Sequence, residues 1–167
     1  VAFYDCEHDT ILKENKIYSD NLIEDYLVSN IAFYISGPLW KRSFLNEQKL
    51  LFDETIHNLD DWDFNLRMLY QELYIVYLDE VLIKYRIHEE SLSHEIGKLN
   101  FNEIQSEFRA IKKHLLLIAE NKKASPKKLK IYLKNRYKYI LREALVADNK
   151  QKFFYLKELL ILEFQLL

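Results

Sequence analysis

The pattern of hydrophobic and polar positions changes near residue 99. Before it, apolar runs of strand length alternate with stretches whose apolar residues recur at helical spacing. Beyond it, helical spacing continues to the end of the chain. Alternating strand-like and helical stretches are typical of an α/β layer, and a sustained helical period is typical of packed helices. We therefore expect an α/β part in residues 1–99 and an all-helical part in residues 100–167.

The first part is expected to contain four strands and three helices. β-Branched and aromatic residues at strand length predict strands in residues 1–6 and 30–36, and two more in 74–88 joined at Asp79-Glu80. Helices are expected in residues 20–29, in 36–45 after the Gly37-Pro38 turn signal, and in 59–71.

The second part is expected to contain about three helices. An apolar stripe runs from Phe101 to Ile118 at helical spacing. Ser125 followed by Pro126 is a typical helix start, and that helix should continue to about residue 147. Asp148 and Gln151 have the spacing of a capping box that would open the last helix.

Composition excludes several functional classes. With two glycines in the chain, no glycine-rich phosphate-binding loop can be present. The single cysteine, Cys6, allows no internal disulfide and no zinc-ligand spacing. No apolar run reaches the roughly 20 residues that span a bilayer. The only methionine is Met68, so we expect the chain to be a piece of a longer protein.

Charge divides the chain at the same place as periodicity. Residues 1–99 carry nineteen acidic against nine basic side chains, and residues 100–167 carry seven against fifteen. Nine basic and no acidic residues lie in 122–142, interleaved with tyrosines. A solvated helix face explains this stretch, and an anionic membrane surface is the next interpretation. Nucleic acid is not expected, because no recognised binding motif accompanies the charge.

Three carboxylates, Asp60, Asp61 and Asp63, crowd the start of the expected helix at residues 59–71. One hypothesis is that they stabilise the positive end of the helix. The other is that one of them takes a proton from a substrate hydroxyl. A metal site formed by Asp61 and Asp63 is disfavoured, because residues two apart diverge by about 200° on a helix.

A second polar cluster follows the last expected strand. Arg86 and His88 alternate along an extended segment, so both should point to the same face. With the hydroxyls of Ser91 and Ser93, they would suit a phosphate-rich ligand. The alternative is that Arg86 pairs with nearby acids and His88 is a surface residue.

Three consecutive motifs resemble a known family. They are "SGPLWKRSFL", "LLFDETIHNLDDWDFNLRML" and "YLDEVLIKYRIHEESLS". In order, interval and flanking hydrophobic residues they are similar to the acceptor-side half of family-2-type glycosyltransferases of GT-A fold. The resemblance covers roughly residues 1–95. It implies an incomplete GT-A-like layer that would be completed by a donor-binding half preceding Val1.

The resemblance implies roles for particular residues. Asp61 matches the general base that deprotonates the acceptor hydroxyl, and Asp60 stands where the family usually has glutamate. Arg86 and His88 match the residues that close over the nucleotide diphosphate and its metal, with Ser91 supporting the same oxygens. His88 would be a metal ligand only with the missing half present.

The resemblance also implies a setting. Trp62 and the turn at Gly37 would line the acceptor side. The expected enzyme is inverting, requires Mn²⁺ or Mg²⁺ and transfers sugar from a nucleotide-sugar to a saccharide or lipid-linked acceptor. It would work in the cytoplasm, at the membrane through residues 122–142, in bacterial surface-polysaccharide synthesis. The rival hypothesis is a non-catalytic binding or scaffolding module whose basic helices contact a partner or membrane.

Overall fold

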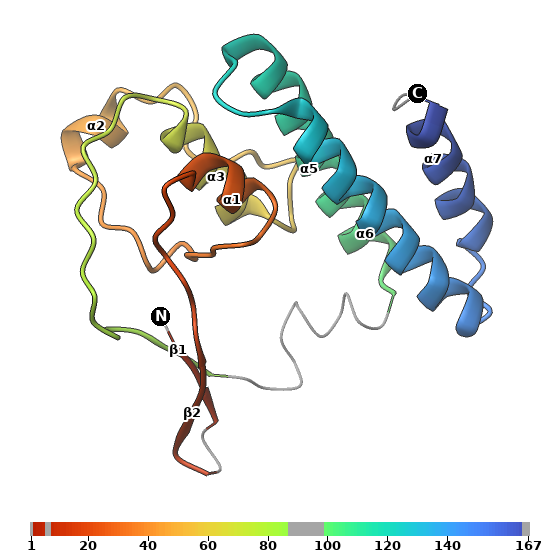
Figure 1. The fold of residues 1–167 in the computed structure, drawn as a ribbon, viewed down its shortest axis with the longest axis horizontal. Coiled ribbons are helices and arrows are strands. Elements are labelled where there is room, and N and C mark those ends of the chain that lie inside the picture. The colour runs from red at the N-terminus through yellow and green to blue at the C-terminus, as the bar shows by residue number, and fades with distance from the viewer. Residues whose placement is uncertain (1, 6–7, 87–98, 165–167) are drawn as a thin grey trace. The chain divides into compact units, whose positions relative to one another are not determined.

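The computed structural model describes residues 2–5, 8–86 and 99–164 (Figure 1). The chain forms two compact units. The first consists of Val1–Thr55 and Leu59–Ser91, and the second of Ile56–Asn58 and Leu92–Leu167. The division along the chain therefore lies between residues 91 and 92, before the expected change at residue 99. The second unit also takes a three-residue segment from the middle of the first.

The first unit contains a small mixed sheet. Its strands are β1 (Ala2–Asp5), β2 (Thr10–Glu14) and β3 (Lys84–Arg86), in the order β2-β1-β3. Strand β1 pairs with β2 antiparallel and with β3 parallel. In the parallel pair, Phe3 lies opposite Tyr85 and Tyr4 opposite Arg86. The β1–β2 hairpin projects at the N-terminal end of the chain in Figure 1.

Three helices complete the first unit, namely α1 (Leu22–Leu27), α2 (Arg42–Asn46) and α3 (Asp60–Leu69). All three were expected. Helix α3 supplies most of the core, through Trp62, Phe64, Leu66, Met68 and Leu69. It packs against α1, from which Tyr26 and Leu27 are buried. This packing fixes the start of α3, where the acidic residues gather.

The strand predictions were partly wrong. The first strand, β1, is confirmed, and β3 lies within the last expected strand. Residues 30–36 and 74–83 form no strand, and β2 was not predicted. A strand requires a partner for its backbone hydrogen bonds, and local sequence does not specify that partner. Residues 30–36 instead form a loop with a turn in which the Gly37 N–H donates to the Tyr34 carbonyl at 2.9 Å.

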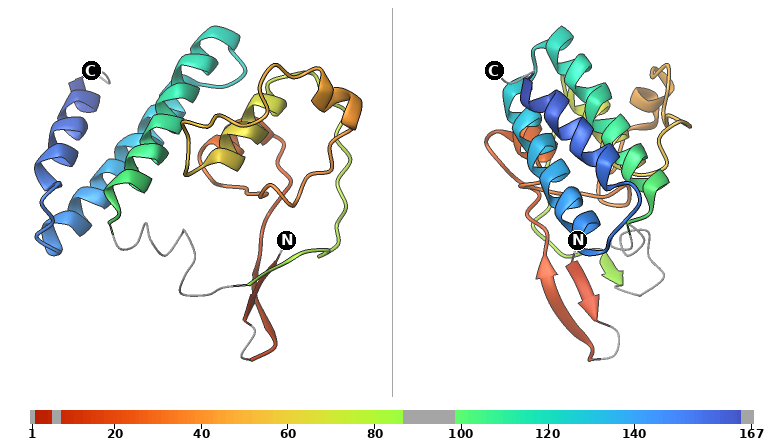
Figure 2. Two further views of the ribbon diagram at one scale, coloured as in Figure 1. Left: turned by 180° about the vertical axis from the view of Figure 1, so that it is seen from behind. Right: turned by 90° about the vertical axis from the view of Figure 1, so that its right-hand side faces the viewer.

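The second unit is built on three helices, α5 (Phe101–Asn121), α6 (Pro126–Val146) and α7 (Lys152–Phe164) (Figure 2). All three predicted helices are confirmed, and α6 follows Ser125 in the N-cap position as expected. Helix α6 packs between the other two. The buried residues recur at helical spacing, and they include Ile104, Phe108, Ile111 and Ile118 of α5, Leu129, Leu133, Tyr137 and Ile140 of α6, and Tyr155, Leu159 and Leu162 of α7.

The capping prediction for α7 was wrong in its residues. The Asn149 side chain, rather than that of Asp148, accepts a hydrogen bond from the Gln151 N–H at 2.8 Å. Asp148 has a left-handed backbone with φ 48°, and its carboxylate pairs with Lys152. Asparagine can stabilise a short turn through its side chain in the same way as aspartate, so the sequence pattern did not distinguish the two.

Polar contacts join the three helices of the second unit. Lys112 of α5 donates to Glu158 of α7 at 2.5 Å, and the Tyr137 hydroxyl of α6 donates to the same carboxylate at 3.1 Å. Arg136 binds Glu107 through two hydrogen bonds of 2.5 and 2.9 Å. Glu107 is only 4% exposed, so this bidentate pair is a buried link between α5 and α6.

Glu158 should make the stability of the second unit depend on pH. Burial raises the pKa of Glu158, but the hydrogen bonds and charge of Lys112 and the Tyr137 hydroxyl outweigh it and hold the pKa below its ordinary 4.5. A lowered pKa in the folded state stabilises the fold above pH 4.5, and this contribution is lost as pH falls through the folded value.

Urea unfolding, monitored by the circular dichroism of the helices, tests this pH dependence. The difference in unfolding free energy between the wild type and Glu158→Gln should be present at neutral pH and shrink as the carboxylate is protonated. Glu120→Gln, at an exposed position of α5, is the matched control. A difference that does not change with pH would contradict the prediction.

None of the described helices combines the length and the apolar character needed to cross a membrane.

Candidate functional site at the start of helix α3

Helix α3 begins at a residue with unusual backbone geometry. Leu59 precedes the helix with φ 68° and ψ 26°, in the left-handed region that a residue with a Cβ seldom adopts. Such a conformation persists only where the surrounding structure imposes it. The three acids that follow have very different surroundings, since Asp60 is exposed, Asp61 is half-buried and Asp63 is fully buried.

Asp63 is a structural residue of the core. It is 0% exposed, and its carboxylate pairs with the Arg67 Nε one helical turn later at 2.9 Å. The same guanidinium donates through Nη1 to the Leu50 carbonyl at 2.6 Å and through Nη2 to the Leu51 carbonyl. Arg67 therefore neutralises a buried charge and fastens the loop before α3 to the helix.

Asp61 has the surroundings of a candidate base. Burial raises the pKa of Asp61 above its ordinary value, and the neighbouring charge of Asp60 raises it further. Hydrogen bonds from the backbone N–H groups of Trp62, Ile35 and Asp61 itself lower it, but the net shift is upward. A carboxylate with a raised pKa is a better proton acceptor near neutral pH.

The capping hypothesis also receives support at Asp61. The N–H groups of residues 61 and 62 belong to the first turn of the helix, where backbone donors have no partner within the helix. The Asp61 carboxylate therefore satisfies part of the helix start. The third donor, Ile35, lies far away in sequence, so helix capping alone does not account for the arrangement.

The turn around Gly37 lies against Asp61. Ile35 belongs to this turn, which the Gly37–Tyr34 backbone hydrogen bond closes. A side chain at position 37 would meet the Phe33 Cβ at 3.3 Å and the Tyr34 carbonyl oxygen at 3.4 Å, so glycine suits this close approach. The structure thus brings together Asp61 and the turn that was expected on the acceptor side.

An aromatic ring near Asp61 comes from Tyr34 and was not predicted as a site residue. Burial raises the pKa of the Tyr34 hydroxyl, and the charges of Tyr85 and Asp61 add to the rise. The ring stacks on Tyr85 of β3 with centroids 5.3 Å apart. The sequence did not single out Tyr34 as a site residue, because residues 30–36 have the composition of a strand and were predicted to form one.

Trp62 belongs to the core rather than to an open wall. Its side chain is buried, 7% exposed, and its indole Nε1 donates to the Tyr26 carbonyl at 3.1 Å. The indole therefore fixes α3 to α1. Among the residues expected to line the acceptor side, the turn at Gly37 is close to Asp61, and Trp62 faces inward.

The structure does not bring Arg86 to Asp61. Arg86 is exposed on β3, and its neighbour Tyr85 packs against Phe3 and Tyr34. Successive strand residues point to opposite faces, so Arg86 is directed away from the face where Tyr85 meets Tyr34. Within the described part of the chain, no ion pair joins the guanidinium to Asp61.

His88 and Ser91 lie outside the described residues, so the expected diphosphate cluster stays a prediction. In the described ranges no group of three His, Cys, Asp or Glu side chains could hold a metal ion. The expected Mn²⁺ or Mg²⁺ therefore stays a prediction. Asp61 and Asp63 have separate surroundings, since the Asp63 carboxylate pairs with Arg67 and the Ile35 N–H acts on that of Asp61.

The basic stretch at residues 122–142 is partly neutralised within the second unit. Lys134 and Lys138 pair with Glu163 at 2.7 and 3.8 Å, and Arg136 pairs with Glu107. Tyr137 is a core residue, as helical spacing predicts. For these three of the nine basic residues the solvated-face interpretation is favoured, because their charges already have partners in neighbouring helices.

Comparison with protein-family models, with curated proteins and with solved structures found no match to this chain.

Proposed function

We propose that this chain is the acceptor-side half of an inverting glycosyltransferase that moves a sugar from a nucleotide-sugar to an acceptor hydroxyl. The observation that supports this best is the half-buried Asp61 carboxylate at the start of α3, whose pKa burial raises and against which the Gly37 turn is packed. The three motifs around this residue resemble the family's acceptor side. Both arguments point to the same residue.

In the proposed reaction, the Asp61 carboxylate takes the proton of the acceptor hydroxyl. The acceptor oxygen then forms a bond to the anomeric carbon as the bond from that carbon to the diphosphate oxygen breaks. Attack from the face opposite the leaving group inverts the configuration. The nucleoside diphosphate leaves with the bonding electron pair, and donors at His88 and Ser91 would stabilise its growing charge. Arg86 would join them only if β3 turned it toward Asp61 once the preceding half was present.

The donor and metal sites belong, in this proposal, to residues preceding Val1. A saccharide or lipid-linked acceptor would approach the Gly37 turn, in the cytoplasm of a bacterium that builds surface polysaccharide. The gene upstream of Val1 provides the first check. It should encode an apolar strand that ends in Asp-x-Asp, and its absence would contradict the proposal.

Turnover is the direct test. The protein extended upstream as its gene encodes it is incubated with a panel of nucleotide-sugars, divalent cation and saccharide acceptors, and released nucleoside diphosphate is measured. We expect release with one donor class, dependent on acceptor. Absence of turnover across the panel, together with no binding of nucleoside diphosphates, would refute the proposal.

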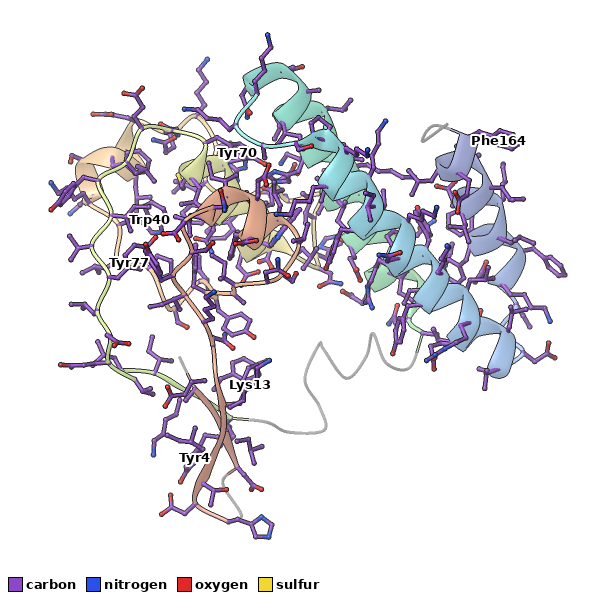
Figure 3. All side chains as sticks on the ribbon, in the orientation of Figure 1. Tyr4, Lys13, Trp40, Tyr70, Tyr77 and Phe164 are labelled. Carbon is purple, nitrogen blue, oxygen red and sulfur yellow. The ribbon has the colours of Figure 1, made fainter. Side chains whose placement is uncertain are left out.

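A binding or scaffolding module is the second candidate, and one observation favours it. Helix α7 exposes large apolar side chains as well as burying others. Phe153 is 72% and Phe164 is 77% exposed, and Phe164 extends from the end of the helix in Figure 3. An apolar face of this kind is a typical interaction surface. The upstream gene sequence and the turnover panel distinguish this candidate from the enzyme.

A further inference from the structure

The loop that reaches Asp61 is fastened to helices α1 and α3 by a buried hydrogen-bond network. The Tyr26 hydroxyl of α1 donates to the Phe33 carbonyl at 2.9 Å. The Asn65 Nδ2 of α3 donates to the Tyr26 hydroxyl oxygen at 3.1 Å and to the Phe33 carbonyl at 3.4 Å. The rings of Tyr26 and Phe33 also stack, with centroids 4.2 Å apart. Three separate segments thus meet at one carbonyl.

The donor directions in this network are fixed by chemistry. A carbonyl oxygen only accepts, so the Asn65 atom facing Phe33 must be the amide nitrogen. Tyr26 uses its hydrogen on the same carbonyl and therefore accepts from Asn65. Each contact has one donor and one acceptor, so the network is self-consistent.

Asn65 occupies a position where an apolar residue would be the ordinary choice. It is 0% exposed, and its Oδ1 is buried with no hydrogen-bond partner in the described residues. Burying an unpaired polar oxygen is unfavourable, and a leucine of similar size would avoid it. The amide is therefore best explained by the hydrogen bonds that its nitrogen donates to the Tyr26 hydroxyl and the Phe33 carbonyl.

Asn65 and Asp61 act on the same loop from the same side of α3. They are four residues apart, so they lie on one face of the helix. Asn65 contacts the Phe33 carbonyl. The N–H of Ile35, two residues further along, is among the groups that lower the pKa of Asp61, so the turn lies near this carboxylate. The backbone hydrogen bond from the Gly37 N–H to the Tyr34 carbonyl closes the turn that contains Ile35.

We infer that Asn65 and Tyr26 are positioning residues, which hold the turn at residues 33–37 next to the Asp61 carboxylate. Any effect of these two residues on turnover rests on the proposed function. Their role in holding the turn does not. A turn fixed next to the carboxylate keeps backbone N–H groups near it, which favours the ionised form that an acceptor hydroxyl would meet. Neither Asn65 nor Tyr26 touches the substrate in this arrangement.

The test is the titration of Asp61, followed by carboxyl ¹³C NMR in the full chain. Tyr26→Phe and Asn65→Leu should each raise the pKa of Asp61 by about half a unit or more, because a lost N–H contact no longer favours the charged form. The Ile35 amide should exchange with solvent about tenfold faster in both variants, because the turn that carries it is no longer held in place. Tyr155→Phe removes a buried hydroxyl without a partner from α7 and should change neither quantity.

An unchanged Asp61 titration and unchanged Ile35 exchange in both variants would overturn the inference. If Asn65→Leu fails to fold, Tyr26→Phe decides, because it removes a single oxygen from a ring that keeps its stacking. The same variants in the upstream-extended enzyme should lower kcat more than they change KM. If Asp61→Asn leaves turnover intact while the titration shifts as expected, the proposed function fails and the positioning role stands.

Discussion

Replacing Arg67 by alanine is expected to lower the free energy of unfolding of the first unit by about 3–5 kcal/mol. Asp63, which is fully buried, would lose the ion-pair partner that Arg67 now provides at 2.9 Å. A buried carboxylate without a counterion carries most of its desolvation penalty uncompensated. The carbonyls of Leu50 and Leu51 would lose their guanidinium donors as well.

Tryptophan fluorescence during urea unfolding measures this loss, because both tryptophans, Trp40 and Trp62, lie in the first unit. Arg42→Ala at an exposed position of α2 is the matched control and should change stability by no more than about 0.5 kcal/mol. The double variant Asp63→Leu/Arg67→Met should regain part of the loss, since it removes the buried charge. A loss for Arg67→Ala no larger than that of the control would show that the pair does not stabilise the core.

Under the proposed function, replacing Asp61 by asparagine in the upstream-extended protein is expected to lower kcat by about a hundredfold to ten-thousandfold. Asparagine keeps an oxygen that can accept from the Ile35 N–H, so the turn and the helix start should survive. It cannot take a proton from the acceptor hydroxyl. The loss should therefore appear in the chemical step, with little change in donor binding.

The pH profile separates this role from a structural one. A base must be ionised, so the rate should rise with pH through the pKa of Asp61, which lies above its ordinary 3.8. Asp60→Asn removes a charge that raises this pKa, so the rising limb should move to lower pH. Glu72→Gln, exposed just beyond α3, should leave the profile in place. Wild-type turnover in Asp61→Asn would refute the base assignment.

Local sequence predicted the helices well and the strands poorly. The start of α6 at Ser125 and Pro126 is confirmed because capping and proline geometry depend on adjacent residues. The apolar stripe of α3 is confirmed for the same reason, although Leu59 falls outside the helix in a left-handed conformation. Residues 30–36 have the composition of a strand, but no neighbouring strand pairs with them, and contacts from Tyr26 and Asn65 decide their course.

The sequence by itself determined that three carboxylates stand at the start of a helix, because helical periodicity and the free donors of a first turn are local properties. Local periodicity did not distinguish Asp60, Asp61 and Asp63, which have the same side chain and nearly the same neighbours, and only the motif resemblance singled out Asp61. The tertiary structure gave them different surroundings, by leaving Asp60 exposed, placing the Ile35 turn near Asp61 and pairing Asp63 with Arg67. Burial and hydrogen bonding set the chemistry of a carboxylate, and both come from chain segments distant in sequence.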